Sequence, residues 1–244
     1  MKLLLNHITN KMRGAIRRFI GVEMLYKEFE LINAKFADLS EIASLVAKIS
    51  TAEYIENNMV MAKALNSKFE VFDFCFSQED KLTDGLVCEF GVYKGETINY
   101  IAKKLQCDVF GFDSFEGLPE NWRNGFEQGI FKINKESFSK YENNIQIIQG
   151  LFNQSLPIFL SNHAKPISFL HIDCDLYSST KTIFDLLGDR LLPGTIIVFD
   201  EYFNYPSWKK HEYLAFSEFI NNSTLNYEYL CYNKFHEQVA VKLI

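Results

Sequence analysis

The sequence predicts an α/β fold in which a mainly parallel sheet carries helices on both faces. From residue 85 onward, short apolar runs alternate with segments of helical periodicity, which is the pattern of strands linked by helices. The chain of 244 residues is also 48% hydrophobic, enough to build one sizeable core. The predicted parallel strands are Leu86–Phe90, Val109–Phe112, Ile145–Ile148, Ile167–Ile172 and Thr195–Phe199.

The segments between and after these strands complete the sheet. Thr97–Leu105 and Ser179–Leu187 have clear helical periodicity, and a further helix is predicted at about residues 209–221. The last two apolar runs, Tyr227–Tyr232 and Gln238–Leu243, are joined by a segment short enough for a hairpin turn. Because so short a connection requires antiparallel pairing, the sheet is expected to include one antiparallel strand near the C-terminus.

Residues 1–80 are predicted to form a helical extension packed on a core domain of residues 81–244. Ser40 and Thr51 are the expected N-caps within this extension. Residues 1–22 contain basic residues and no acid, with apolar residues at helical spacing. This pattern favours a helix packed on its own domain or on a second subunit, as in a homo-oligomer, over a helix on a membrane surface.

Composition restricts the partners and the compartment. The net charge of −6 argues against a nucleic-acid partner. The five cysteines form no CxxC pair, which is typical of reduced, packed thiols in a cytoplasmic protein. No apolar run is long enough to span a bilayer, so no transmembrane segment is expected.

A glycine-containing turn, Glu89–Gly95, joins the first of these strands to the helix that follows it. Glycines accept positive φ and let a ligand lie against bare backbone, and the free N–H groups at the start of the helix attract an anionic group. Tyr93 stands where a dinucleotide motif has its middle glycine, which obstructs a pyrophosphate. A ligand without phosphate, such as S-adenosylmethionine, fits better, and Glu89 is expected to receive its ammonium group.

Asp113 follows Glu89 by 24 residues and ends the second strand. An acid at this distance suits the two ribose hydroxyls of an adenosine, although it can instead be a turn acid or a helix cap. The residues predicted to contact the cofactor are Glu89, Phe90, Gly91, Gly95, Thr97, Asp113, Ser114, Gly150 and Asp173.

Further acids follow two neighbouring central strands. Asp173 and Asp200 end these strands and Glu201 comes next, and three carboxylates of this kind suit Mg²⁺. The alternative is that Asp200 and Glu201 only cap the following segment. Asp175 is the candidate general base, or else the N-cap of the next helix. His171 is expected to be a core histidine rather than a ligand.

A long loop after the second strand contains Trp122 and Arg123. Loops of this length near a site are often lids, so these side chains are expected either to cover the cofactor or stack on a sugar, or simply to pack.

Four of these segments resemble the macrocin O-methyltransferase family. These are class I, S-adenosylmethionine-dependent enzymes that methylate sugar hydroxyls in antibiotic biosynthesis and bind Mg²⁺. The resemblance covers about residues 50–244 and implies the Rossmann-like sheet of class I methyltransferases. The segments that carry it are Glu89–Gly95, Phe112–Pro119, His171–Thr180 and Pro193–Tyr202.

The resemblance also implies roles for individual residues. It places Mg²⁺ on Asp173, Asp200 and Glu201, although the family usually has aspartate at the last position. It assigns the role of general base to Asp175.

The sequence therefore predicts an S-adenosylmethionine-dependent, Mg²⁺-assisted O-methyltransferase. Its acceptor would be a small molecule or glycan with a free hydroxyl on a sugar or another vicinal diol. A catechol-type O-methyltransferase needs the same metal and base and is not distinguished by the sequence. A nucleotide-binding oxidoreductase is disfavoured by Tyr93, and a non-catalytic binding protein is disfavoured by the acids retained at the strand ends.

Overall fold

The computed structural model describes residues 23–24, 27, 38–78, 82–133 and 140–244. The basic helix predicted for residues 1–22 lies outside the described residues. The chain divides into two compact units, residues 1–46 and residues 47–244.

The larger unit begins well before the predicted boundary at residue 80. The reason is that α3 (Lys68–Phe76) packs into the main core and the short strand β1 (Lys63–Leu65) pairs with β7 (Tyr227–Asn233). The predicted N-cap at Thr51 is also wrong, because Thr51 lies inside α2 (Leu39–Asn58).

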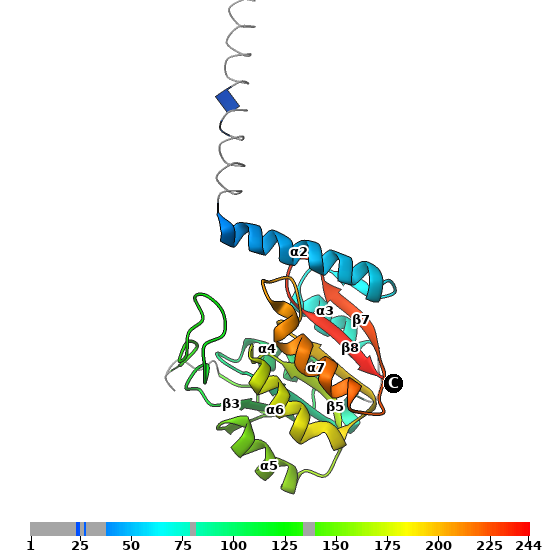
Figure 1. The fold of residues 1–244 in the computed structure, drawn as a ribbon. Helices are drawn as coiled ribbons and strands as arrows, with labels where there is room; N and C mark the ends of the chain where they lie inside the picture. The colour runs from blue at the N-terminus through cyan, green and yellow to red at the C-terminus, as the bar shows by residue number, and fades with distance from the viewer. Residues whose placement is uncertain (1–22, 25–26, 28–37, 79–81, 134–139) are drawn as a thin grey trace, which may run out of the picture. The chain divides into compact units, whose positions relative to one another are not determined.

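Most of the remaining elements agree with the predicted ones; helix α5 was not predicted, and β6 begins four residues before the predicted strand. Short 3-10 turns occupy Leu82–Asp84, Gly188–Arg190 and Trp208–Lys210. The strands are β2 (Leu86–Phe90), β3 (Val109–Asp113), β4 (Ile145–Gln149), β5 (Ile167–Ile172), β6 (Leu191–Phe199) and β8 (Val239–Leu243), and the helices are α4 (Glu96–Leu105), α5 (Phe152–Asn162), α6 (Tyr177–Leu187) and α7 (Glu212–Asn221) (Figure 1).

The eight strands form one sheet in the order β1-β7-β8-β6-β5-β2-β3-β4. Strand β8 is antiparallel to β6 and β7, and every other neighbouring pair is parallel, which confirms the predicted sheet. The chain runs outward from β2 through β3 to β4 and then returns to β5 on the other side of β2. Ligands of open α/β sheets bind at such a reversal, beyond the carboxyl ends of the strands.

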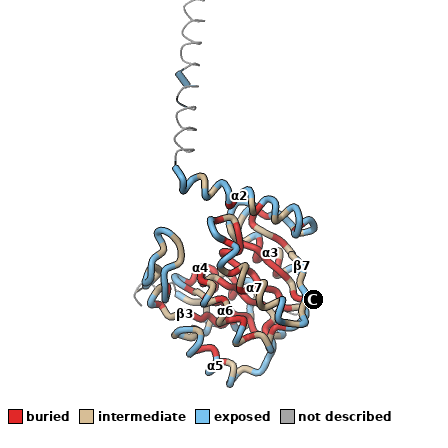
Figure 2. Tube along the Cα trace, viewed as in Figure 1, coloured by how far each residue is buried: buried red, intermediate tan, exposed pale blue. Residues whose placement is uncertain are grey.

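Two buried layers hold helices on the two faces of the sheet (Figure 2). Because side chains alternate along a strand, Cys88 and Phe90 of β2 face one layer and Val87 faces the other. The first layer is completed by α5, α6 and α7, and the second by α3 and α4. Glu89 shares the α3–α4 side with Val87, and this position decides its role in the site.

Thr51 fastens helix α2 to the segment that follows β6. Its hydroxyl oxygen accepts a hydrogen bond from the backbone N–H of Asn204 at 2.9 Å, and Thr51 is 5% exposed. Thr51→Val keeps the shape of the side chain but leaves this N–H without its acceptor. We expect the free energy of unfolding in urea to fall by about 1–2 kcal/mol. The same change at the exposed Thr224 should leave it unaltered, and equal midpoints for both variants would contradict this role.

Candidate active site

A cavity of about 440 Å³ lies at the carboxyl ends of the central strands, at the reversal between β2 and β5. One part of its wall comes from the ends of β2, β3 and β4, with Gly91, Asp113 and Gly150. Another part comes from the residues after β5 and β6, with Asp175 and Glu201. Tyr93, Ser114, Trp122, Arg123, Phe126, Phe131 and Asp173 also line it.

Gly91 allows the ends of β2 and β5 to come together. Its φ is +94°, and a Cβ at this position would lie 1.6 Å from the backbone oxygen of Asp173. No other residue type fits so close a backbone approach. The chain therefore turns away from the sheet here and leaves room for a ligand beside bare backbone.

The carboxylate of Asp113 holds this turn in place. One of its oxygens accepts hydrogen bonds from the backbone N–H groups of Val92 and Tyr93, at 2.9 and 2.8 Å. The other accepts from the N–H of Phe115 at 2.7 Å. Asp113 thus combines the predicted position in the cavity with the turn-capping role that the sequence left open.

Several predicted cofactor contacts do not line the cavity. Gly95 is instead required by packing, since a Cβ there would lie 2.6 Å from the ring of Tyr141. Thr97 is buried in the first turn of α4. Phe90 stacks on Phe112 within the core, with ring centroids 4.5 Å apart.

Glu89 has a partner within the protein instead of facing the cavity. It is fully buried, and its carboxylate lies 2.8 Å from Nδ1 of His171. The two residues are directly opposite each other on β2 and β5. One Glu89 oxygen therefore faces His171, while Oε1 is buried without a hydrogen-bond partner among the described residues, and the predicted contact of Glu89 with a cofactor ammonium group stays a prediction.

His171 also brings Glu89 into contact with the candidate metal ligands. Ligand atoms of His171, Asp173 and Asp200 all lie within 4.8 Å of one another, and we call these three residues the candidate metal group. Nε2 of His171 is 3.9 Å from Asp200, too far for a hydrogen bond. His171 was expected to be only a core residue; it is a buried residue that links Glu89 to the candidate metal group.

The crowding of charges shifts the pKa values in this group. Burial raises the pKa of Asp173, and the carboxylate of Asp200 raises it further. Burial also opposes ionisation of Asp200, but His171 outweighs it and holds the pKa of Asp200 below its usual range. Burial lowers the pKa of His171, yet Asp200 and Glu89 outweigh burial and raise it to about 10. A cation beside these carboxylates would relieve the crowding.

Glu201 lies outside the candidate metal group, unlike the prediction. Asp200 and Glu201 both follow β6, which ends at Phe199, so the alternation of side chains along a strand does not fix their directions. The backbone N–H of Glu201 donates to the carboxylate of Glu212 in α7 at 3.1 Å, and its own carboxylate lines the cavity. One carboxylate oxygen of each of these glutamates is buried without a hydrogen-bond partner in the described part of the chain.

Asp175 lies in the cavity wall with a φ of +62°, in the left-handed region. Burial raises its pKa to about 7, and Arg123 partly opposes this. The following helix has Leu176 as its N-cap, with no capping bond from a side chain, so Asp175 is not the N-cap. A carboxyl group with a pKa near neutrality is suited to accept a proton at physiological pH.

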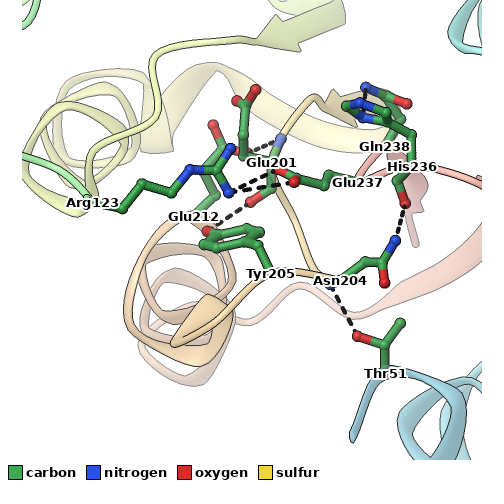
Figure 3. Close-up of polar contacts among 9 residues, drawn as sticks. All are labelled: Thr51, Arg123, Glu201, Asn204, Tyr205, Glu212, His236, Glu237 and Gln238. Atoms are coloured by element: carbon green, nitrogen blue, oxygen red, sulfur yellow. Dashed lines mark hydrogen bonds and ion pairs between the residues drawn. The ribbon is translucent and has the colours of Figure 1, made fainter. Parts of the chain in front are cut away.

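Arg123 holds the loop of residues 114–131, which we call the cavity loop, against the β7–β8 hairpin (Figure 3). Its guanidinium lies 3.3 Å from the carboxylate of Glu237 and packs over the rings of Trp122 and Tyr205 at 3.9 and 4.6 Å. Both Trp122 and Arg123 also line the cavity. Packing and ligand contact, left as alternatives by the sequence, are therefore compatible.

Sequence reasoning overlooked Glu212, Glu237 and Gln238. Glu212 follows the predicted start of a helix, and the other two precede the last strand, so each looks like an ordinary surface residue in the sequence. The signal that was present is the polar pair Glu237-Gln238 at the start of the last apolar run, which was predicted from Gln238 and begins as a strand at Val239, at the same sheet edge as the other acids.

Comparison with known proteins agrees with this fold. Residues 88–202 match the model of a methyltransferase domain family. A curated relative from Streptomyces olivaceus, 8-demethyl-8-(2,3-dimethoxy-alpha-L-rhamnosyl)-tetracenomycin-C 4'-O-methyltransferase, is 25% identical over 174 residues. The match covers 61% of this chain and 63% of the relative, so the chain spans less than two thirds of that protein. The resemblance to sugar O-methyltransferases is confirmed by this relative.

Two solved structures show that the sheet and its helices form the class I methyltransferase fold. The calicheamicin methyltransferase CalS11 aligns with a TM-score of 0.54 at 20% identity, over 78% of this chain and 85% of that one. The O-methyltransferase NovP aligns with a TM-score of 0.55 at 18% identity, over 71% of this chain and 79% of that one. Separately, none of the helices in the described residues is long and apolar enough to cross a membrane.

Proposed function

We propose that the chain is an S-adenosylmethionine-dependent O-methyltransferase that acts on a sugar hydroxyl. Residues 88–202 of this chain match a methyltransferase domain. The observation that carries the proposal is the single cavity in which the Gly91 turn and Asp113 meet Asp173 and Asp175. A cofactor surface and a candidate base thus share one space. The name of the tetracenomycin relative, which acts on a rhamnosyl group, supports a sugar over a catechol as acceptor.

The cofactor would lie along the first part of the cavity wall. Gly91 offers bare backbone, Asp113 and Ser114 offer oxygens near the end of β3, and Gly150 leaves space at the end of β4. Tyr93, whose ring packs against Phe131 at 5.5 Å, occupies space that a pyrophosphate would need. S-adenosylmethionine, when bound, supplies an electrophilic methyl group on its sulfonium sulfur.

The candidate metal group fits Mg²⁺. Asp173 and Asp200 offer carboxylate oxygens, which Mg²⁺ prefers, while His171 remains engaged with Glu89. When bound, Mg²⁺ would lower the pKa of an acceptor hydroxyl and orient a vicinal diol. Glu201, outside the group, would contact the acceptor rather than the metal.

Asp175 is the proposed general base. Its carboxylate would take the proton that the acceptor hydroxyl loses as its oxygen bonds to the methyl carbon. The products are the methyl ether and S-adenosylhomocysteine. Trp122 and the neighbouring rings of the cavity loop would exclude water and offer an apolar surface to a sugar ring.

The test is transfer of labelled methyl groups from S-adenosylmethionine to a panel of rhamnosides, other hexosides and catechols, with Mg²⁺ present or chelated. We expect labelled sugars and a loss of transfer on chelation. Labelled catechols with unlabelled sugars would replace the acceptor assignment by the catechol-type alternative. Absence of transfer to every member, despite cofactor binding, would support the non-catalytic alternative.

Asp175→Asn should reduce turnover about 10²- to 10⁴-fold, the usual contribution of a general base, and leave the cofactor dissociation constant nearly unchanged. Asparagine tolerates the left-handed backbone of this position, so the fold should persist. Turnover is measured with an acceptor from the panel and affinity by calorimetry with S-adenosylhomocysteine. Turnover equal to that of the parent protein would exclude Asp175 as the base.

The proposed setting is the reducing cytoplasm. All five cysteines are free, and four of them are buried. Unpaired thiols of this kind are typical of proteins that are not exposed to an oxidising compartment.

A further inference from the structure

Gln238 holds the candidate metal ligand Asp200 from the β7–β8 hairpin. Its Nε2 donates to a carboxylate oxygen of Asp200 at 3.1 Å, and Gln238 is only 3% exposed. Its Oε1 accepts a hydrogen bond from Nδ2 of Asn233 at 2.8 Å. This second bond fixes which end of the amide faces Asp200, so the carboxylate has a defined orientation.

Glu237, the residue before Gln238 in the same hairpin, holds the cavity loop. Both carboxylate oxygens of Glu237 lie within 3.4 Å of a guanidinium nitrogen of Arg123. The pair is well shielded, since the Arg123 and Glu237 side chains are 26% and 15% exposed. Three rings surround the guanidinium, those of Trp122, Phe126 and Tyr205. Glu237 thus reaches Arg123 of the cavity loop (Figure 3), and Gln238, the next residue, reaches Asp200 of the candidate metal group.

The hairpin itself is tied to its surroundings by backbone atoms. The carbonyl of Glu237 accepts from the N–H of Tyr202 at 3.1 Å, and the carbonyl of His236 accepts from Nδ2 of Asn204 at 3.2 Å. The N–H of Asn233 donates to the carbonyl of Gln238 at 2.9 Å. A segment fixed in this way moves as a unit, so a change at Gln238 is felt at Glu237.

We propose that the β7–β8 hairpin couples the candidate metal group to the cavity loop through the adjacent residues Gln238 and Glu237. Gln238 is a positioning residue for Asp200, and Glu237 is a positioning residue for Arg123. Binding of Mg²⁺ fixes Asp200 and Gln238, and thereby orders the cavity loop. Coupling between two equilibria is reciprocal, so an ordered loop also strengthens Mg²⁺ binding. The inference rests on the proposed magnesium site.

The first test uses the full chain without substitution. Amide hydrogen exchange of residues 114–131 is measured with and without Mg²⁺, and binding of Mg²⁺ is followed by calorimetry. We expect bound Mg²⁺ to slow exchange in the cavity loop. Bound Mg²⁺ with unchanged exchange there would overturn the coupling, whatever the variants do.

Two variants then test the Gln238–Asp200 contact and the Glu237–Arg123 contact separately. Gln238→Met keeps the volume and removes the bond to Asp200; it should weaken Mg²⁺ binding about 10-fold or more and remove the effect of Mg²⁺ on the loop. Glu237→Gln should speed exchange in the loop without metal and also weaken Mg²⁺ binding. The matched controls are Gln154→Met and Glu53→Gln, both at exposed positions outside the cavity loop. Mg²⁺ affinities equal to those of the controls would contradict the proposal.

Failure of the proposed coupling and failure of the proposed methyl transfer give different results. Methyl transfer by a chain that binds no Mg²⁺ would overturn the coupling and leave the reaction standing. Absence of S-adenosylmethionine binding, with Mg²⁺ still slowing exchange in the cavity loop, would overturn the proposed reaction and leave the coupling standing. If Gln238→Met does not fold, the measurement on the unsubstituted chain and the Glu237→Gln variant still decide the question.

Discussion

Gly91→Ala is expected to abolish S-adenosylmethionine binding and to lower the free energy of unfolding by about 3–5 kcal/mol. This loss is larger than that caused by most single substitutions. A Cβ here would lie 1.6 Å from the backbone oxygen of Asp173. Relief of this overlap requires the ends of β2 and β5 to move apart, and the cavity is built on those two ends. The backbone φ of +94° adds a further cost for any residue with a Cβ.

The control for this variant is Gly194→Ala. Gly194 has a similar φ of +98°, but a Cβ there would have no atom within 4 Å. The free energy of unfolding of Gly194→Ala should therefore fall only by the cost of placing alanine at a positive φ, about 1–2 kcal/mol, and the variant should keep cofactor binding. Urea unfolding and calorimetry measure the two effects. Equal losses of stability in both variants would show that the close approach to Asp173 has no role.

Asp200→Asn is expected to abolish Mg²⁺ binding and to reduce methyl transfer about 10³-fold, the equivalent of several kcal/mol of lost metal assistance. The substitution removes a carboxylate from the candidate metal group but keeps an oxygen for Gln238. It also removes the charge that pairs with His171, which holds the pKa of Asp200 below its usual range. Urea unfolding of the variant is therefore measured alongside Mg²⁺ binding, so that a loss of folding is not mistaken for a loss of the metal ligand.

Asp189→Asn, at an exposed position after α6, makes the same chemical change away from the site. It should bind Mg²⁺ and transfer methyl groups like the parent protein. Calorimetry with MgCl₂ and the labelled transfer assay give the two readouts. Unaltered Mg²⁺ binding in Asp200→Asn would remove Asp200 from the metal assignment, and unaltered transfer would remove the metal from the mechanism.

The strands could be predicted because each is an apolar run between turn residues, and their order along the chain limits the topology. Strand β1 escaped prediction because it has only three residues and gains its place from pairing with β7. Helix α5 escaped because Pro157 lies inside it, which normally argues against a helix. The local sequence pattern was sufficient to predict long elements, and it was insufficient where tertiary contacts determine whether a segment forms a strand or a helix.

The acids of the site could be predicted for a similar reason: carboxyl ends of parallel strands meet at one edge. Their partners could not. The pairing of Glu89 with His171 depends on the register between β2 and β5, which the sequence does not reveal. Arg123 and Glu237 are 114 residues apart, and nothing local to either one indicates the other. The exclusion of Glu201 from the candidate metal group depends on the direction of its side chain after β6.

The most direct test of the central claim is calorimetry of the full chain with S-adenosylmethionine and, separately, with NAD. The Gly91 turn, Tyr93 and Asp113 favour an adenosine without a pyrophosphate. The expected result is binding of S-adenosylmethionine at one site per chain and no heat of binding with NAD. Binding of NAD without binding of S-adenosylmethionine would contradict the account.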